Sequence, residues 1–146
     1  MSTLIDTNVL LRRLDPAHDH HHAAIAAAQQ VLAGGAPAHV AAQSVAEFCA
    51  VATRPRSANG LGLDVAAALA AVGQIERTFQ LLPDDPAVYD EWKKLVAQHR
   101  VVGLRVFDAR LVAVMRVHEI ARILTFNTGD FAGYDGIEVL DPAGVE

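Results

Sequence analysis

The chain has 146 residues, of which 52% are hydrophobic and 20% are charged, and its formal net charge is −5. A chain of this length and composition buries a core of its own, which excludes an intrinsically disordered protein and indicates one domain spanning residues 1–146. The negative net charge argues against a protein that binds nucleic acid through an overall positive charge. Acids that surround a bound cation would, however, also make the formal net charge more negative.

Cys49 is the single cysteine, so the chain forms no internal disulfide and is a poor candidate for a thiolate metal site. We expect its side chain to fill the core. No apolar run approaches the ~18 residues that a membrane span needs, and Asp6 interrupts the N-terminus before the apolar region of a signal peptide could form. The sequence therefore predicts a cytoplasmic protein that does not enter a membrane.

The first predicted element is a short buried strand containing Leu4 and Ile5, after which the chain turns polar at Asp6 and Asn8 and enters a helix. This places Asp6 at the carboxyl end of a parallel strand, the edge of an open α/β sheet where ligands bind. Asp is also a common N-cap residue. This segment alone favours the cap, and only further carboxylates at the same edge would favour a functional site.

A helix over about residues 20–32 begins in a polar stretch rich in histidine, which contains His18, His20, His21 and His22. Such a stretch resembles a metal-binding tract in composition. Histidines crowded at a helix start are more often a solvated face. We therefore expect these side chains to be solvated rather than to form a physiological metal site.

A weak strand at residues 37–41 precedes a helix that we expect Ser44 to cap. Apolar residues recur from Val45 at the spacing of one helical face, which leaves Glu47 beside that face. Ser44 and Glu47 also fit a capping box, in which the Glu47 side chain bonds back to the helix start. The sequence leaves open whether Glu47 belongs to a cap or to a site.

Arg54 and Arg56 end this helix, and a glycine-containing loop follows at residues 57–62. Such arginines are commonly solvated, but beside an acidic site they become candidates for contacts to phosphate. After the loop the pattern predicts a helix over about residues 64–77.

A third strand at residues 79–82 precedes a helix that starts at Asp85 and carries Trp92 on its apolar face. We expect Trp92 to belong to the core rather than to stack on a base. Two further strands are predicted nearer the C-terminus, at residues 122–126 and 137–140.

The helix over residues 106–117 carries another candidate acid. Counting from Asp108 at helical spacing reaches Leu111 and Met115, so a charge begins the stripe that this helix must bury. Asp108 is then either an N-cap at the rim or part of a shared polar pocket. Its position beside Phe107 favours the pocket.

Strands that alternate with helices predict an α/β fold in which a parallel sheet has helices on both faces. The carboxyl ends of parallel strands share one edge, and the acids that would gather there are Asp6, Glu47, Asp108 and Asp130. Clustered carboxylates raise one another's pKa, which favours a bound cation. Oxygen ligands without cysteine or paired histidine favour Mg²⁺ or Mn²⁺, and these cations typically serve phosphate substrates.

Four segments together resemble the PIN-domain ribonucleases, in particular the VapC toxins of bacterial toxin–antitoxin systems: Asp6-Thr7-Asn8, Glu47, residues 107–111 and residues 125–131. Their order and spacing are specific, and the similarity extends from Leu4 to Pro142. The resemblance implies a three-layer fold with a five-stranded parallel sheet flanked by helices. It also implies an Mg²⁺- or Mn²⁺-dependent endoribonuclease that cleaves RNA, forms a homodimer and is inhibited by a cognate VapB-like antitoxin.

The resemblance further assigns roles to individual residues. The family's four acidic positions are matched by Asp6, Glu47, Asp108 and Asp130. Asp6 and Asp108 would be the main metal ligands, and the other two acids would bind the metal directly or through water. Supporting hydrogen bonds would come from Asn8, Ser44, Thr125 and Asn127.

Basic residues near this edge are candidates for RNA contacts, and these are Arg54, Arg56, Arg105 and Arg110. Phe107 is a departure from the family, because many relatives have His at this position. A Phe side chain donates no hydrogen bond. Substrate handling at this position is therefore expected to differ.

The implied mechanism is hydrolysis of an RNA phosphodiester, with one metal activating water and a second, ~3.5–4 Å away, stabilising the leaving 3′ oxygen. Single-stranded loops are the favoured targets because their phosphates are exposed.

A housekeeping PIN nuclease of RNA processing, without an antitoxin, is the main alternative. An aspartyl-phosphate phosphotransferase is disfavoured, because Asn8 stands where such an enzyme normally has a second aspartate.

Overall fold

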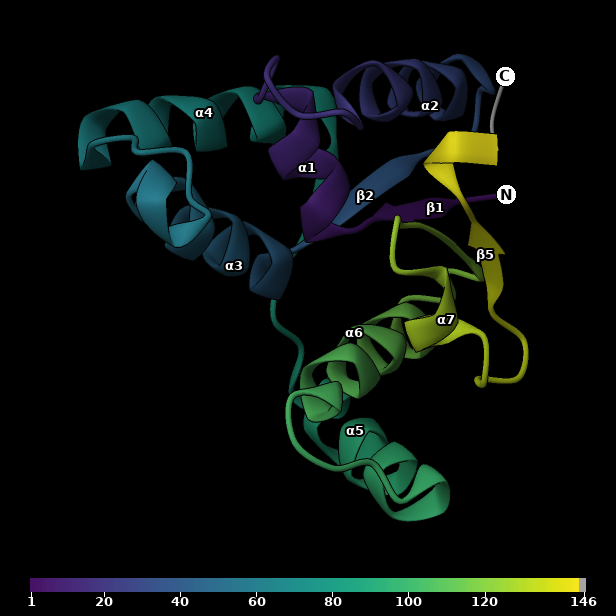
Figure 1. The fold of residues 1–146 in the computed structure, drawn as a ribbon. Helices are drawn as coiled ribbons and strands as arrows, with labels where there is room; N and C mark the ends of the chain where they lie inside the picture. Colours follow the sequence, from purple (N-terminus) through teal and green to yellow (C-terminus); the bar gives the residue numbers. More distant parts are fainter. Residues whose placement is uncertain (145–146) are drawn as a thin grey trace.

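Five parallel strands form the central sheet of the computed structural model, which describes residues 1–144 (Figure 1). Their order across the sheet is β3-β2-β1-β4-β5. The strands are β1 (Thr3–Ile5), β2 (Ala38–Ala41), β3 (Gln80–Leu82), β4 (Arg122–Leu124) and β5 (Glu138–Leu140). The predicted α/β fold with a five-stranded parallel sheet is confirmed.

Helices cover both faces of this sheet and complete the three predicted layers (Figure 1). One face carries α1 (Thr7–Arg13), α2 (His21–Ala33), α3 (Ala42–Ala52) and α4 (Val65–Thr78). The opposite face carries α5 (Pro86–His99), α6 (Arg105–Val117) and the short α7 (Thr128–Phe131). Two 3-10 turns add η1 (Arg56–Ala58) and η2 (Pro142–Gly144). Within residues 1–144, no helix combines the length and the apolar composition that crossing a membrane requires.

The central strands are buried on both faces, because consecutive side chains of a strand point to opposite sides of the sheet. In β1, Leu4 packs into the core with α5 and α6, whereas Ile5 packs into the core with α1 to α4. Ile123 and Leu124 of β4 divide in the same way. All four side chains are fully excluded from solvent. Burial on both faces explains why these strands appear in the sequence as short apolar runs rather than as alternating patterns.

The start of α3 differs from the prediction. The helix begins at Ala42, directly after β2, and Ala41 in the N-cap position has no side chain that could bond to the helix. Ser44 therefore lies inside the first turn, so the predicted N-cap at Ser44 and its capping box with Glu47 are wrong. The extended end of β2 passes straight into the helix, so the sheet fixes the direction of α3 without a capping side chain.

The strand order reverses beside β1. The chain moves outward from β1 to β2 and β3, and then returns to place β4 on the other side of β1. Parallel pairing sets Ile5 opposite Leu124, so the residues that follow them, Asp6 and Thr125, lie next to each other. Such a reversal opens a crevice at the carboxyl ends of the strands, and ligands of open α/β sheets bind there.

Truncation of Phe48 tests the core between the sheet and helices α1 to α4. Its ring is fully buried there, so Phe48→Ala should lower the free energy of unfolding by about 3–5 kcal/mol, as measured by urea denaturation. Leu69 is 60% exposed on α4, and the control Leu69→Ala should change the stability by less than ~1 kcal/mol. Equal losses in the two variants would contradict this description of the core.

Candidate active site

Asp6 is held at the end of β1 by hydrogen bonds to several neighbours. Its backbone N–H donates to the Leu124 carbonyl at 3.0 Å, and its Oδ1 accepts from the Thr7 backbone N–H at 2.7 Å. Its Oδ2 accepts from the Thr125 hydroxyl at 2.8 Å. The residue is 6% exposed and also occupies the N-cap position of α1. Asp6 therefore caps α1 and also lies in the crevice. The helix-cap and functional-site interpretations of this residue do not exclude each other.

Burial raises the pKa of Asp6, and the charges of Glu47 and Asp130 raise it further. The hydrogen bonds from Thr125 and Thr7 act in the opposite direction, because they stabilise the ionised form. The burial effect is the larger one, so the net shift is upward. A buried carboxylate under these conditions is stabilised by any cation that comes close to it.

Glu47 reaches the same region from the middle of α3. Its Oε2 accepts from the Thr7 hydroxyl at 3.1 Å, and its Oε1 accepts from the Gln43 side-chain amide at 2.9 Å. The same Gln43 nitrogen donates to the Phe107 carbonyl at 3.0 Å, and the Gln43 oxygen accepts from Arg110 at 2.9 Å. Gln43 therefore connects Glu47 to α6 across the crevice.

Asp108 lies in the first turn of α6, which begins at Arg105 with Leu104 in the N-cap position, so Asp108 is not the cap. Its pKa is raised to about 6, mainly by burial and by the charge of Asp130. The charges of Asp6 and Glu47 also raise this pKa, whereas Arg105 lowers it. The side chain thus faces a common acidic region, as the pocket alternative predicts.

Arg105 provides positive charge within this group. Its Nε lies 3.4 Å from Asp108 Oδ2, and its Nη1 lies 3.7 Å from Asp130 Oδ1. Its Nη2 donates to the Asp130 backbone carbonyl at 3.1 Å. The guanidinium is 54% exposed, so this contact is partly screened by water. Arg105 nevertheless links two acids that come from different helices.

The residues fit a hard divalent cation by their chemistry. The group consists of carboxylates, which are the oxygen donors that Mg²⁺ and Mn²⁺ prefer, and two of them, Asp6 and Asp108, have raised pKa values that a nearby cation would lower. The side-chain arrangement is not that of a complete ligand set. Within residues 1–144, no three His, Cys, Asp or Glu side chains are placed so that they could hold one metal ion.

The predicted supporting residues differ in what they contact. Asn8 donates to the Thr125 hydroxyl at 3.1 Å and accepts from the Phe126 N–H at 3.2 Å, so it fastens the loop after β4 to α1. Asn127 contributes its backbone N–H, which donates to Thr125 Oγ1 at 3.0 Å. Ser44 contributes its carbonyl oxygen, which accepts from Thr7 at 3.3 Å, while its buried hydroxyl has no hydrogen-bond partner in the described part of the chain.

The four candidate arginines fall into two groups. Arg105 contacts Asp108 and Asp130, whereas Arg110 contacts Gln43, which bonds to Glu47. Arg56 instead pairs with Asp15 at 3.4 Å, beside a separate hollow of about 290 Å³. Arg54 is exposed in the turn before η1.

The histidine stretch makes specific contacts. The His20 ring stacks on Phe126 with the ring centroids 4.5 Å apart and the planes 8° from parallel. His21 Nδ1 lies 2.8 Å from the Arg12 carbonyl oxygen. Because Phe126 directly follows Thr125, the start of α2 lies against the loop that carries this residue of the site.

Thr7 and Gln43 are two polar residues of the crevice that sequence reasoning missed. Gln43 lies four residues before Glu47, a spacing that places both on one face of a helix, and this signal could have identified it. Thr7 offers no comparable pattern, because it bonds to a residue 40 positions away.

Together these features define an α/β domain with a cluster of carboxylates where the strand order reverses. The chain belongs to the PIN domain family, whose model matches residues 3–137. Among curated proteins, no match to this chain was found.

Solved structures with a similar fold include several toxin–antitoxin proteins. VapBC2 from Rickettsia felis, bound to a DNA fragment from its promoter, is 12% identical with a TM-score of 0.69, and the match covers 97% of this chain and 98% of that one. FitAcB from Neisseria gonorrhoeae is 22% identical with a TM-score of 0.66, covering 97% and 99%. The sarcin-ricin loop cleaving toxin VapC20 from Mycobacterium tuberculosis is 16% identical with a TM-score of 0.65, covering 92% and 98%.

The raised pKa of Asp108 predicts how stability depends on pH. The folded protein retains this proton up to about pH 6, whereas the carboxyl group releases it near 3.8 when the chain is unfolded. Between these values the folded state binds more protons, so this residue's contribution to the free energy of unfolding decreases as the pH rises. Asp108→Asn removes the effect. Without divalent metal, the Tm of the wild type should therefore fall relative to that of the variant as the pH rises through this range. The measured quantity is the Tm of the variant minus the Tm of the wild type at each pH, and it should increase.

The matched control is Asp64→Asn, because Asp64 caps α4 at an exposed position and Asn caps a helix about as well as Asp. This control measures the effect of an acid-to-amide change away from the crevice. A Tm difference for Asp108→Asn that is constant with pH would contradict the crowding of the four acids.

Proposed function

We propose that this protein is an Mg²⁺- or Mn²⁺-dependent endoribonuclease and the toxin component of a type II toxin–antitoxin pair. The observation that carries the proposal is the mutual influence of four acids at the reversal of strand order, in a chain of the PIN family. Crowded carboxylates persist in a fold when a bound cation or a shared proton offsets their repulsion. Support for the toxin assignment comes from the similar folds of VapBC2 and FitAcB, and support for RNA as substrate comes from that of VapC20.

In this proposal Asp6 and Asp108 hold the metal, and Glu47 and Asp130 bind it directly or through water. The metal supplies activation of water for attack on phosphorus and stabilisation of charge on the leaving oxygen. The protein's own contribution is to restrain the carboxylates. Thr125 and Asn8 fix Asp6, because the Thr125 hydroxyl donates to the carboxylate while it accepts from the Asn8 amide.

Glu47 is restrained in the same way by Thr7 and Gln43, which each donate to one of its two oxygens. Its orientation therefore does not depend on a metal. Arg105 is assigned to the RNA phosphate, since a cation that neutralises Asp108 and Asp130 would weaken the contacts that now hold its guanidinium. Arg110 lies on the Gln43 side of the acids, and Arg54 and Arg56 are assigned to more distant phosphates.

The proposed partners are the RNA substrate, a VapB-like antitoxin and a second copy of this chain in a homodimer, and the proposed compartment is the cytoplasm. Residues 1–146 would act as one PIN domain. A housekeeping nuclease of RNA processing would share the whole catalytic site, so the presence of an antitoxin separates the two functions.

A graded series of variants tests the nuclease. Asp108→Asn should reduce cleavage of single-stranded RNA in Mg²⁺ or Mn²⁺ by more than about 100-fold, because loss of a supporting residue alone typically costs about 10–100-fold. Thr125→Val removes the hydroxyl that orients Asp6 and should fall within that smaller range. Asp64→Asn should cleave at the wild-type rate, and a chelator should abolish cleavage in every variant. Near-normal cleavage by folded Asp108→Asn would overturn the assignment.

Expression in bacteria tests the toxin. The wild-type protein alone should arrest growth, whereas Asp108→Asn should not, and co-expression of the small gene next to its own should restore growth. The measurement is the growth curve after induction, with protein levels matched by immunoblot. If the purified protein cleaves RNA but its expression leaves growth unaffected, the RNA-processing function is the correct one.

A further inference from the structure

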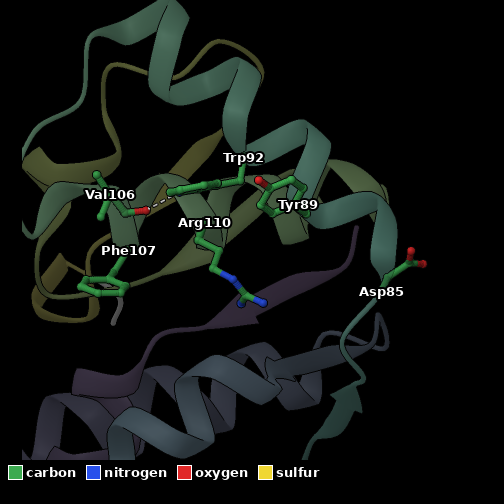
Figure 2. Close-up of a pocket in the computed structure, with 6 residues that line it drawn as sticks. All are labelled: Asp85, Tyr89, Trp92, Val106, Phe107 and Arg110. Atoms are coloured by element: carbon green, nitrogen blue, oxygen red, sulfur yellow. Dashed lines mark hydrogen bonds between the residues drawn. The ribbon is translucent and has the colours of Figure 1, made fainter.

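A cavity of about 310 Å³ lies between α5 and α6, and none of the four acids lines it. Figure 2 shows Tyr89 and Trp92 from α5 together with Phe107 and Arg110 from α6 around this cavity. Asp85 completes its outer rim. A volume of this size is at the lower end of the range for small-molecule sites, which extends from ~300 to ~1,000 Å³.

The aromatic side chains of this pocket are held in place but are not buried. The Trp92 indole N–H donates to the Val106 carbonyl at 2.8 Å, which fixes the plane of the ring (Figure 2). The Tyr89 ring lies 6.1 Å from the Trp92 ring, and Lys93 Nζ lies 5.5 Å from the Tyr89 ring centroid. Tyr89 is 61% exposed and Phe107 is 52% exposed. Trp92 is thus only partly a core residue, and it also forms a wall of the pocket.

The aromatic pocket continues toward the acids. A second hollow, of about 340 Å³, is lined by Glu47 and Gln43 and shares Phe107 and Arg110 with the aromatic pocket. Gln43 joins the two regions chemically, since it accepts from Arg110 and donates to Glu47. The aromatic pocket is therefore the neighbouring subsite along a path that begins at Glu47.

We infer that this pocket binds one unpaired nucleobase of an RNA strand whose phosphate lies at the acids. The inference rests on the proposed function and names a subsite of its substrate. Flat aromatic faces suit a base because every base has a π face, and stacking on such faces is a common way in which proteins bind single strands. The adjoining Arg110 and Lys93 add the positive charge that a phosphodiester backbone requires.

The charges of the rim favour a base over an apolar peptide segment or a second copy of this chain. Asp85 lines the pocket, and Asp84, which lines the neighbouring hollow, pairs with Arg110 at 3.3 Å. A base can meet these groups with amino and ring N–H donors, whereas an apolar surface would cover them without a hydrogen bond.

Fluorescence provides a direct test, because Trp92 is the only tryptophan of the chain. Short single-stranded oligoribonucleotides should change its emission when they bind to the wild-type protein in a chelator, where no cleavage is expected. The same RNA with a single abasic nucleotide should lose this change when the abasic nucleotide occupies one particular position. A signal that is insensitive to abasic nucleotides at every position, or no signal with RNA that is shown to bind by filter retention, would overturn the proposal.

Substitution of Tyr89 provides the second test. Tyr89→Leu keeps an apolar side chain but removes the ring, and it should weaken the binding of intact RNA by about tenfold, within the usual effect of losing one stacked base. Its effect on the abasic RNA should be less than about twofold. Leu69→Ala, an exposed apolar change on α4, is the control and should leave both affinities unchanged.

Other occupants of the pocket give different results. If Tyr89→Leu leaves RNA binding unchanged but dissociates the homodimer in sedimentation, or releases a co-purified antitoxin, the pocket is a protein interface and the proposal is wrong. Failure of the proposed nuclease is recognised separately. In that case the wild type cleaves no RNA with any divalent metal, while the fluorescence comparison still shows whether Trp92 contacts a base.

Discussion

The hydrogen bond between Thr125 and Asp6 joins the carboxyl ends of the two central strands, and the geometry of the site depends on it. It exists because β1 and β4 are neighbours in a parallel sheet and their registers end together. A shift of one residue in either strand would turn one of these side chains toward the opposite helical layer. The register is secured in turn by Leu4, Ile5, Ile123 and Leu124, whose alternation fills the cores on both sides of the sheet. The position of a polar pair is thus set by apolar packing.

The other acids come from different layers of the molecule. Glu47 belongs to α3 on one face of the sheet, whereas Asp108 and Asp130 belong to α6 and α7 on the other. Gln43 spans this division, because it bonds to Glu47 within its own helix and to Phe107 and Arg110 of α6. The acidic region is therefore assembled only when both helical layers are docked on the sheet.

The fold was predictable because its strands are short apolar runs and its longer helices carry periodic apolar faces, and most elements fall close to their expected places. The place of Asp6 was predictable from the sheet, since a parallel sheet gathers the residues that follow its strands at one edge, whereas Asp108 follows helix α5 and reaches the other acids only through the packing of α6. The errors concern local chemistry. Ser44 looked like a cap, but the direct passage from β2 into α3 removed the need for one, and the four residues of α7 are too few to give a periodic pattern. The contacts of Arg105 and Thr7 join distant parts of the chain, and no local pattern encodes them.

Arg105 has a further consequence for the proposed metal site. Many small metal-binding domains unfold when the ion is removed, because the ligands then repel one another or lie unsatisfied in the interior. Here a guanidinium on the same chain lies against two of the acids and reduces their repulsion. The folded state therefore carries an internal counter-ion. In the proposed nuclease, loss of the divalent cation would then stop cleavage while the sheet and its helical layers stay assembled, so that activity could return without refolding when the cation is supplied again.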